Sequence, residues 1–179
     1  MGGQLILNRV DILWNIELKV LYLYIQTQNF AKMSNNKVVG FACDHAAYDM
    51  KEFLVGYMSA KGYEVVDFGC YSEERCDYPD FAHPLANAIE ESVVNFGIAL
   101  CGSGEGMAMT LNKHKGVRAG LAWCKDVAAL VKQHNNANAL VLPARFISND
   151  EAVELVDTFI AAEFEGDRHL QRVAKISEC

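Results

Sequence analysis

The sequence predicts an α/β fold in which helices cover both faces of a five-stranded parallel sheet. Two observations lead to this prediction. From residue 37 onward, short apolar segments alternate with longer segments whose apolar residues recur at helical spacing. The short segments are apolar almost throughout, which is typical of parallel strands buried on both faces. The chain has 179 residues, of which 51% are hydrophobic and 22% charged, enough for one domain with a sizeable core.

Five segments have the length and the apolar character of buried strands. They are KVVGFAC (37–43), YEVVDFG (63–69), FGIALCG (96–102), GVRAGLA (116–122) and NALVLPA (138–144). Helical or loop segments separate them, as crossover connections between parallel strands require.

Six segments have apolar residues at helical spacing or helix-boundary signals. They are residues 47–62, 81–95, 105–115, 124–135, 148–164 and 167–176. Gly62 is placed to end the first of them, and Pro84 lies near the first turn of the second, where proline is tolerated. Ser148 or Asn149 is a suitable cap for the fifth, with Glu151 in its first turn. Together with the strands, these helices predict a Rossmann-like three-layer α/β/α architecture.

Residues 1–36 differ from the rest of the chain. This segment is rich in apolar residues, but Arg9, Asp11, Glu17 and Lys19 interrupt it, so we expect neither a membrane span nor a signal peptide. The sequence from Met33 resembles a natural start. We therefore expect an N-terminal extension at 1–36, from an upstream start or an appendage, and a single domain at 37–179. The alternative is a helix or strand that docks on that domain.

The composition excludes several classes of function. The formal net charge is −7, and the sequence has no basic stripe with interleaved aromatic residues, which argues against a nucleic-acid partner. The chain has six cysteines, but none forms a C-x-x-C pair or a Cys/His cluster with zinc spacing. We therefore expect a reduced, cytoplasmic protein without a metal site.

Polar residues follow the predicted strands at their carboxyl ends. Asp44 and His45 come after the first strand, Cys101 ends the third and Arg145 follows the fifth. In open α/β sheets, ligands bind beyond the carboxyl ends of the strands. The sequence therefore predicts a site at this edge of the sheet.

The segment CGSGEG, residues 101–106, has glycines at alternate positions that allow backbone N–H groups to approach a ligand oxygen closely. Its spacing differs from the dinucleotide-binding G-x-G-x-x-G pattern, and the G-K-[ST] of a phosphate-binding Walker loop is absent. The remaining interpretation is an anion hole, which holds either a phosphate or an oxyanion that forms during a reaction.

Cys101 stands directly before this loop. The N-terminus of a helix favours the thiolate form of a cysteine, and a thiolate there suits proton abstraction next to a carbonyl. The loop N–H groups and the hydroxyl of Ser103 would then stabilise the enediolate. The alternative is a buried cysteine at a strand end without a chemical role. Asp44 and His134 have similar alternatives, as a helix cap and as a residue favoured at a helix C-terminus.

Arg168 and Arg172 are four residues apart in the last predicted helix and therefore lie on one face of it. With Arg145 they make three guanidinium groups that suit a phosphate. The alternative is a solvated helix face with ion pairs.

Seven motifs together resemble the type B ribose-5-phosphate isomerase family, which also includes the subunits of galactose-6-phosphate isomerase. They are CDHAAYDMK, DYPDFA, CGSGEGM, NKHKGVRAG, QHNNANAL, ARFI and GDRHLQRV, in the family's order between Lys37 and Ile176. The resemblance implies a cytoplasmic enzyme of the pentose phosphate pathway that isomerises a phosphopentose without metal or cofactor. It also implies a homodimer or tetramer with sites between subunits, and therefore a phosphorylated sugar as the substrate.

The resemblance also implies roles for individual residues. Cys101 is the base, and Asp44 and His134 handle ring opening, with His134 as the proton donor. The position after the loop is Met107, which matches the family version that has cysteine, rather than glutamate, as the base. The implied substrate-binding residues are Asp44, His45, Tyr78, Gly102, Ser103, Gly104, Glu105, Gly106, Asn135, Arg145, Arg168 and Arg172.

Three positions depart from the family pattern: Glu105 within the loop, Pro143 before Ala144 and Arg145, and Ala47. A carboxylate that pointed into the loop would oppose an enediolate, so we expect Glu105 to face outward. Other functions stay open at this point. They are isomerisation of a six-carbon sugar phosphate such as allose or galactose 6-phosphate, a non-catalytic sugar-phosphate-binding module, and a redox-sensing thiol protein.

Overall fold

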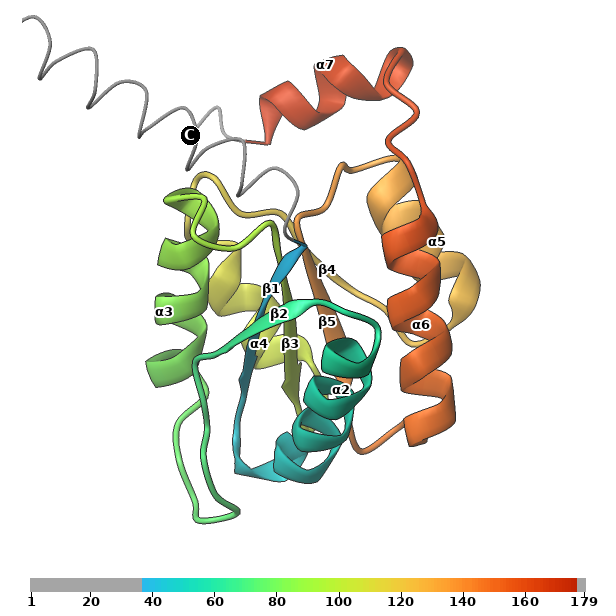
Figure 1. The fold of residues 1–179 in the computed structure, drawn as a ribbon. Coiled ribbons are helices and arrows are strands. Elements are labelled where there is room, and N and C mark those ends of the chain that lie inside the picture. Colours follow the sequence, from blue (N-terminus) through green and yellow to red (C-terminus); the bar gives the residue numbers. More distant parts are fainter. Residues whose placement is uncertain (1–36, 177–179) are drawn as a thin grey trace, which may run out of the picture. The chain divides into compact units, whose positions relative to one another are not determined.

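The computed structural model describes residues 37–176 of the chain (Figure 1). Its strands form a single parallel sheet with the order β2-β1-β3-β5-β4. In chain order they are β1 (Val38–Cys43), β2 (Glu64–Asp67), β3 (Phe96–Cys101), β4 (Ala119–Leu121) and β5 (Ala139–Pro143). This arrangement confirms the predicted five-stranded parallel sheet.

The helices occupy the segments between the strands and after the last one, as predicted. They are the short 3₁₀ helix η1 (His45–Ala47) and the α-helices α2 (Tyr48–Ala60), α3 (Pro79–Glu90), α4 (Glu105–Leu111), α5 (Lys125–Gln133), α6 (Asn149–Ala161) and α7 (Arg168–Lys175). None of the helices among residues 37–176 is both long and apolar enough to cross a bilayer.

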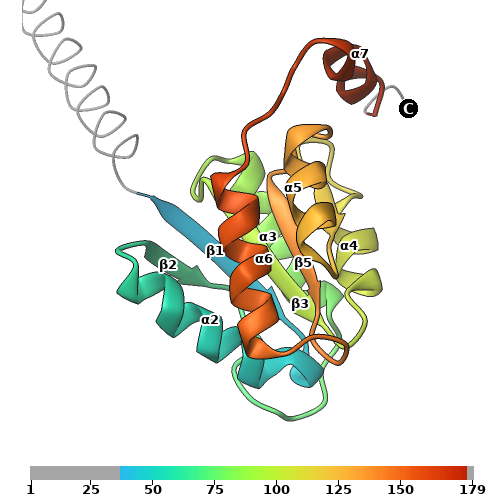
Figure 2. The same ribbon diagram turned by 90° about the vertical axis from the view of Figure 1, so that its right-hand side faces the viewer.

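Helices pack on both faces of the sheet (Figure 2). On one face, α2, α5 and α6 bury a core that includes Leu54 and Phe159. On the other face, α3 and α4 bury a second core that includes Leu85 and Met107. The three-layer α/β/α architecture is therefore confirmed, and the sheet is apolar on both sides because both sides face helices.

The three central strands, β1, β3 and β5, are almost completely buried. In their register, Cys43 lies opposite Leu100, and Cys101 lies opposite Pro143. The carboxyl ends of these strands therefore meet at one edge of the sheet. Asp44, Cys101 and Arg145 lie at or just beyond these ends, as the sequence predicted.

The boundaries of α3 differ from the predicted range 81–95. The helix begins at Pro79, which occupies its first turn, because proline has no N–H to leave unpaired there. It ends at Glu90, because Ser92 adopts a positive φ of 58° and the N–H of Val93 turns back to the carbonyl of Ala88 at 2.8 Å. Val93 and Val94 continue the apolar pattern of the helix, which is why the periodicity alone extends it too far.

The predicted start of α6 is confirmed in detail. Ser148 Oγ accepts a hydrogen bond from the Glu151 N–H at 3.3 Å, and the Glu151 carboxylate accepts one from the Ser148 N–H at 2.7 Å. This reciprocal pair is a capping box. The hydrogen bonds from the Ser148 backbone and side chain lower the pKa of Glu151.

The predicted N-terminal extension, residues 1–36, lies outside the described residues. The predicted last helix is confirmed as α7, which begins one residue later than expected and ends at Lys175.

Candidate active site

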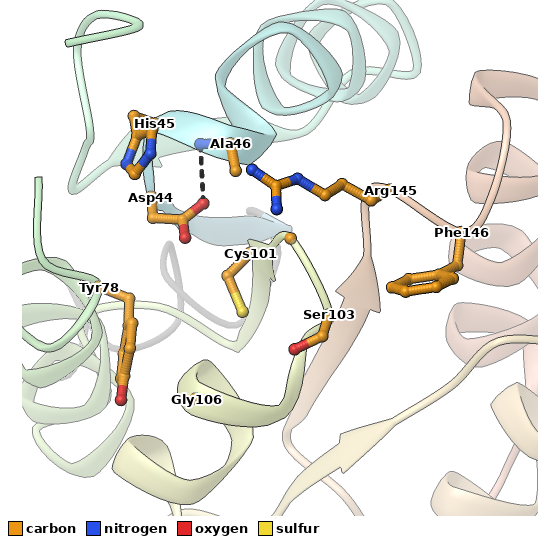
Figure 3. A pocket seen from close by; sticks show the side chains of 10 residues that line it. Asp44, His45, Ala46, Tyr78, Cys101, Ser103, Gly106, Arg145 and Phe146 are labelled. Atoms are coloured by element: carbon orange, nitrogen blue, oxygen red, sulfur yellow. Dashed lines mark hydrogen bonds between the residues drawn. The ribbon is translucent and has the colours of Figure 1, made fainter. Parts of the chain in front are cut away.

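A cavity of about 380 Å³ opens at the carboxyl ends of β1, β3 and β5 (Figure 3). It brings together eight of the predicted site residues from four separate segments of the chain. Its lining consists of Asp44, His45, Ala46, Tyr78, Cys101, Gly102, Ser103, Gly106, Arg145 and Phe146.

Asp44 caps the short helix η1 and lines the cavity at the same time. Its Oδ1 accepts a hydrogen bond from the Ala46 N–H at 3.0 Å, and the residue is only 9% exposed. One carboxylate oxygen is thus used by the cap, and the carboxylate as a whole faces the thiol of Cys101 across the cavity (Figure 3). The neighbouring His45 ring is held from the other side, because its Nδ1 lies 3.3 Å from both the N and the O of Cys76. Asp44 therefore both caps η1 and lines the cavity, so its two predicted roles are compatible.

Cys101 is the last residue of β3 and is 4% exposed. Its Sγ accepts a hydrogen bond from the Gly104 N–H at 3.1 Å. Gly104 makes this bond with a positive φ of 80°, a conformation that a side chain at this position would strain.

The rest of the loop is also arranged around the cavity. Ser103 lines it, and its Oγ accepts from the Glu105 N–H at 3.4 Å. The Glu105 side chain is exposed and does not line the cavity, in agreement with the outward orientation expected for it. Gly104 does not line the cavity, and its N–H donates to the thiol of Cys101. The loop therefore presents a hydroxyl and backbone groups, but no carboxylate, to the cavity.

Tyr78 forms one wall of the cavity and packs against Gly106, the last residue of the loop. A Cβ atom on Gly106 would lie 2.6 Å from Tyr78 Cζ, which is closer than a real contact allows. The third glycine of the segment is therefore needed for close packing of an aromatic ring, rather than for backbone conformation.

Arg145 enters the cavity from the loop that follows β5. This loop is bonded to the anion loop, since the Ala144 N–H donates to the Cys101 carbonyl and the Arg145 N–H to the Gly102 carbonyl, each at 3.0 Å. The guanidinium extends across the cavity toward Ala46 (Figure 3). Pro143, which departs from the family pattern, is the last residue of β5 and lies opposite Cys101. Arg145 thus places a positive charge above the thiol and the loop.

Phe146 is a lining residue that the sequence analysis missed. Its side chain is 74% exposed although it is large and apolar. The only signal in the sequence was its position next to Arg145 in the motif ARFI. Exposed aromatic residues at the rim of a cavity are common where a ligand or a second protein chain covers them.

Six predicted site residues do not line this cavity. Two of them, Gly104 and Glu105, belong to the loop beside it, and the other four are His134, Asn135, Arg168 and Arg172. Helix α5 starts just after the carboxyl end of β4 and runs back, so that His134 at its end lies near the amino end of β5. The segment before α7 is bonded to the same place, because the Glu165 N–H donates to the Gln133 carbonyl at 3.0 Å. Within one chain, the predicted acid therefore lies at the opposite edge of the sheet from the predicted base.

At this second location, His134 stacks on His169, a residue that the sequence analysis did not single out. The ring centroids are 4.3 Å apart and the rings are within 9° of parallel. His169 Nε2 also accepts a hydrogen bond from Arg168 Nε at 3.2 Å. Desolvation, and then the neighbouring charges of His134, Arg168 and Arg172, lower the pKa of His169.

Among the described residues, one group has the composition of a metal site: His134, Glu165 and His169, whose ligand atoms lie within 4.8 Å of one another. The Glu165 carboxylate is 3.7 Å from His134 Nε2 and 3.8 Å from His169 Nε2. The two rings are parallel, so their nitrogen lone pairs do not converge on one point as a tetrahedral ion requires. Arg168 already donates to His169 Nε2. This geometry fits a held pair of imidazoles better than a metal site.

Comparisons with known proteins agree on one family. The family model described as Ribose/Galactose Isomerase matches residues 39–176. A probable ribose-5-phosphate isomerase B from Mycoplasma genitalium is 42% identical over 137 residues, covering 75% of this chain and 90% of the relative. Ribose-5-phosphate isomerase B from Escherichia coli is 38% identical and covers 79% of this chain and 95% of the relative.

Solved structures give the same result. A ribose 5-phosphate isomerase from Thermotoga maritima matches with a TM-score of 0.78 at 46% identity, covering 79% of this chain and 98% of the other. Ribose-5-phosphate isomerase B from Mycoplasma genitalium with bound ribulose-5-phosphate matches with a TM-score of 0.75 at 40% identity, covering 79% and 94%. The family model covers the strands and helices that build the cavity. The chain therefore belongs to the ribose/galactose isomerase family.

Proposed function

We propose that this protein is an aldose–ketose isomerase that interconverts D-ribose 5-phosphate and D-ribulose 5-phosphate without a metal ion. Relatives that span most of this chain are ribose-5-phosphate isomerases, and one of them was solved with ribulose-5-phosphate bound. The domain that carries this activity is residues 37–179, since the family model covers 39–176.

The observation that carries the proposal is the position of the Cys101 thiol. It lies in a cavity with a carboxylate, a guanidinium and a hydroxyl around it, and an N–H group is directed at its sulfur. The thiolate removes the proton from C2 of the open-chain aldose, next to the C1 carbonyl. The electron pair of that C–H bond forms the C1–C2 double bond, and the carbonyl electrons move to O1. The result is an enediolate. Transfer of the hydroxyl proton from O2 to O1 lets the O2 electrons form the C2 carbonyl, while C1 takes back the proton from the thiol, which gives the ketose.

The loop after Cys101 stabilises the negative charge that develops on the enediolate oxygens. Ser103 Oγ and the backbone groups of the loop line the same cavity as the thiol. One such donor typically contributes about 10²–10³ in rate. Arg145 and His45 supply positive charge or hydrogen bonds to the phosphate of the substrate.

We further propose that the enzyme is a homodimer whose two cavities are each completed by the second copy. The cavity holds the base but lacks the predicted acid, His134, and two of the three predicted phosphate-binding arginines. These residues lie at the other edge of the sheet in the same chain and are grouped around the end of α5. A twofold-symmetric pair makes each edge available to the cavity of the partner.

The proposed location is the cytoplasm, and the proposed role is in the pentose phosphate pathway. Cysteines 43, 70, 76, 101 and 124 are free, and two of them, Cys43 and Cys70, have sulfur atoms only 3.6 Å apart. A catalytic thiolate with other free thiols in the domain suits a reducing compartment.

Substrate preference is tested by comparing kcat/KM for ribose 5-phosphate, allose 6-phosphate and galactose 6-phosphate in buffer that contains EDTA. The proposal predicts that ribose 5-phosphate has the highest value, by about 10-fold or more, the order expected when one additional hydroxymethylene group is poorly accommodated. A higher kcat/KM for a six-carbon substrate would assign the chain to the hexose branch of the family. Absence of turnover with all three would contradict the isomerase proposal.

A further inference from the structure

We propose that His169 is a positioning residue that orients both His134 and Arg168 for catalysis. The roles of His134 as proton donor and of Arg168 as phosphate ligand rest on the proposed function. The contacts of His169 with both residues do not depend on it.

The first observation is burial. His169 is 5% exposed, and it is the only buried residue in α7, whose other residues include Leu170 at 58% exposure. A helix that projects from the domain is usually anchored by an apolar side chain, which buries area without a cost for polar groups. Here the anchor is an imidazole. Because burial of polar atoms has a cost, we expect the ring nitrogens of His169 to make specific interactions.

The second observation is the stacking on His134. Parallel rings at 4.3 Å leave the His134 ring little freedom to rotate about its side-chain bonds. Aromatic contacts of this kind contribute modestly to stability but fix the plane of a ring. A proton donor is effective only when its nitrogen points at the atom that receives the proton. His169 therefore supplies the orientation that a residue at the end of a helix would otherwise lack.

The third observation is the hydrogen bond from Arg168 Nε to His169 Nε2 at 3.2 Å. Since Nε2 accepts a hydrogen bond, it carries a lone pair, and the ring is neutral with its proton on Nδ1. The ring stacked on His134 is therefore neutral and has a defined tautomer. The same bond fixes the guanidinium of Arg168. The His169 ring thus contacts the predicted acid, His134, through its face, and the predicted phosphate ligand, Arg168, through Nε2 at its edge.

These two contacts have different chemical requirements, so substitutions can separate them. A flat apolar ring keeps the stacking but loses the acceptor, as in His169→Phe. An amide with an oxygen near the position of Nε2 keeps an acceptor but loses the ring, as in His169→Gln. Leu170→Ala on the same helix changes an exposed side chain with neither contact and serves as the matched control.

The experiment measures kcat and KM of the full-length chain for ribose 5-phosphate in EDTA, with circular dichroism melting curves for each variant. His169→Phe is expected to raise KM about 10-fold while kcat stays near wild type, because Arg168 loses its acceptor. His169→Gln is expected to lower kcat by about 10–100-fold with a smaller change in KM, because His134 loses its orientation. Leu170→Ala is expected to change both by less than about 2-fold.

If both variants had the same decrease in kcat and the same increase in KM, and these changes followed the decrease in melting temperature, His169 would have a structural role only. That result would overturn the proposal. Wild-type kinetics in both variants would overturn it as well. Loss of wild-type activity in EDTA, restored by zinc, would show that a bound metal rather than the ring orients His134.

The stacking can also be measured without any turnover, so its failure is distinguishable from failure of the proposed function. The proton on Cε1 of His134 should show an upfield ring-current shift in NMR spectra of the wild type. That shift should persist in His169→Phe and disappear in His169→Gln. An unchanged His134 resonance in His169→Gln would overturn the proposal even if the wild type were an active isomerase.

Discussion

Gly106 illustrates, at the scale of single residues, how a missing Cβ atom shapes the cavity. Its neighbour is the ring of Tyr78, which forms one wall and would lie 2.6 Å from an added Cβ. Gly106→Ala should therefore displace Tyr78 and raise KM for ribose 5-phosphate by about 10-fold, with a loss of stability of about 1–3 kcal/mol from overpacking. Steady-state kinetics and urea denaturation measure both effects.

Gly56 provides the matched control for this substitution. It lies on the exposed face of α2 with nothing within 4 Å of an added Cβ. Gly56→Ala should leave kcat and KM unchanged and stabilise the protein by about 0.5–1 kcal/mol, through the higher helix propensity of alanine. If Gly106→Ala had wild-type KM, Tyr78 would not be part of the substrate-binding wall.

The residues of the cavity were largely predictable because their positions follow from the fold. Side chains just after parallel strands gather at one edge, and this rule placed Asp44, Cys101 and Arg145 together. Phe146 and His169 were not predictable in the same way. Their importance depends on contacts across the chain, at the cavity rim and on His134, which no local pattern of apolar or charged residues encodes.

At the scale of elements, Lys51 ties α2 to the end of β2. Its side chain is fully buried and forms ion pairs with Asp67 and, at 2.8 Å, with Glu52. Burial opposes the charge, but the hydrogen bonds to Asp67 and Glu52 outweigh it and raise the pKa of Lys51. Asp67 also accepts from the Gly69 N–H at 2.9 Å, so the ion pair supports the turn that leads to Cys70.

This arrangement predicts a pH dependence of stability. A raised pKa in the folded state means that the contribution of Lys51 is fully present below the unfolded value of 10.5 and is lost as the pH rises through the folded value. Lys51→Met should lower the free energy of unfolding at pH 7 by about 1–3 kcal/mol, since it leaves Asp67 without its charged partner.

Urea denaturation of wild type and Lys51→Met at several pH values tests this prediction. The difference between the two proteins should be constant from pH 7 to 9 and should shrink above about pH 10.5. A difference that stayed constant into the alkaline range would show that lost packing, rather than the charge, destabilises the variant.

The elements themselves were predictable in type and order but less so in extent. The start of α6 was predicted at Ser148 or Asn149, and Ser148 is the cap in the structure. This boundary was predictable because the cap is a local interaction between residues three apart. The end of α3 was placed too late, because the exposed Val93 and the buried Val94 both continue the apolar pattern of the helix. Val94 is buried against the sheet after the helix has already ended at Glu90.

At the scale of the whole molecule, the separation of the predicted acid from the predicted base within one chain is the central feature. The cavity contains Cys101, and the opposite edge of the sheet carries His134. The sequence could indicate at which end of the strands each residue lies. It could not indicate how Cys101 and His134 meet, because in our proposal that contact requires a second copy of the chain. The assignment of both residues to one reaction therefore stays a prediction.

Mixing two inactive variants tests whether the sites are shared. Cys101→Ala and His134→Ala should each lose most activity as homodimers. Exchange of subunits between them should restore about a quarter of the wild-type activity, since half of the dimers are then mixed and each mixed dimer has one complete site. If no activity returned although mass spectrometry showed mixed dimers, base and acid would not be supplied by different subunits.

The most direct test of the proposed chemistry follows solvent deuterium into the sugar during turnover of ribose 5-phosphate in D₂O with EDTA. Proton transfer through Cys101 exchanges with solvent, so NMR should detect deuterium at C1 of ribulose 5-phosphate in the wild-type reaction. Cys101→Ala should lose isomerisation and deuterium incorporation together, each by about 10²–10⁴ in rate. Wild-type turnover without any incorporation, or undiminished turnover by Cys101→Ala, would contradict an enediolate mechanism with Cys101 as the base.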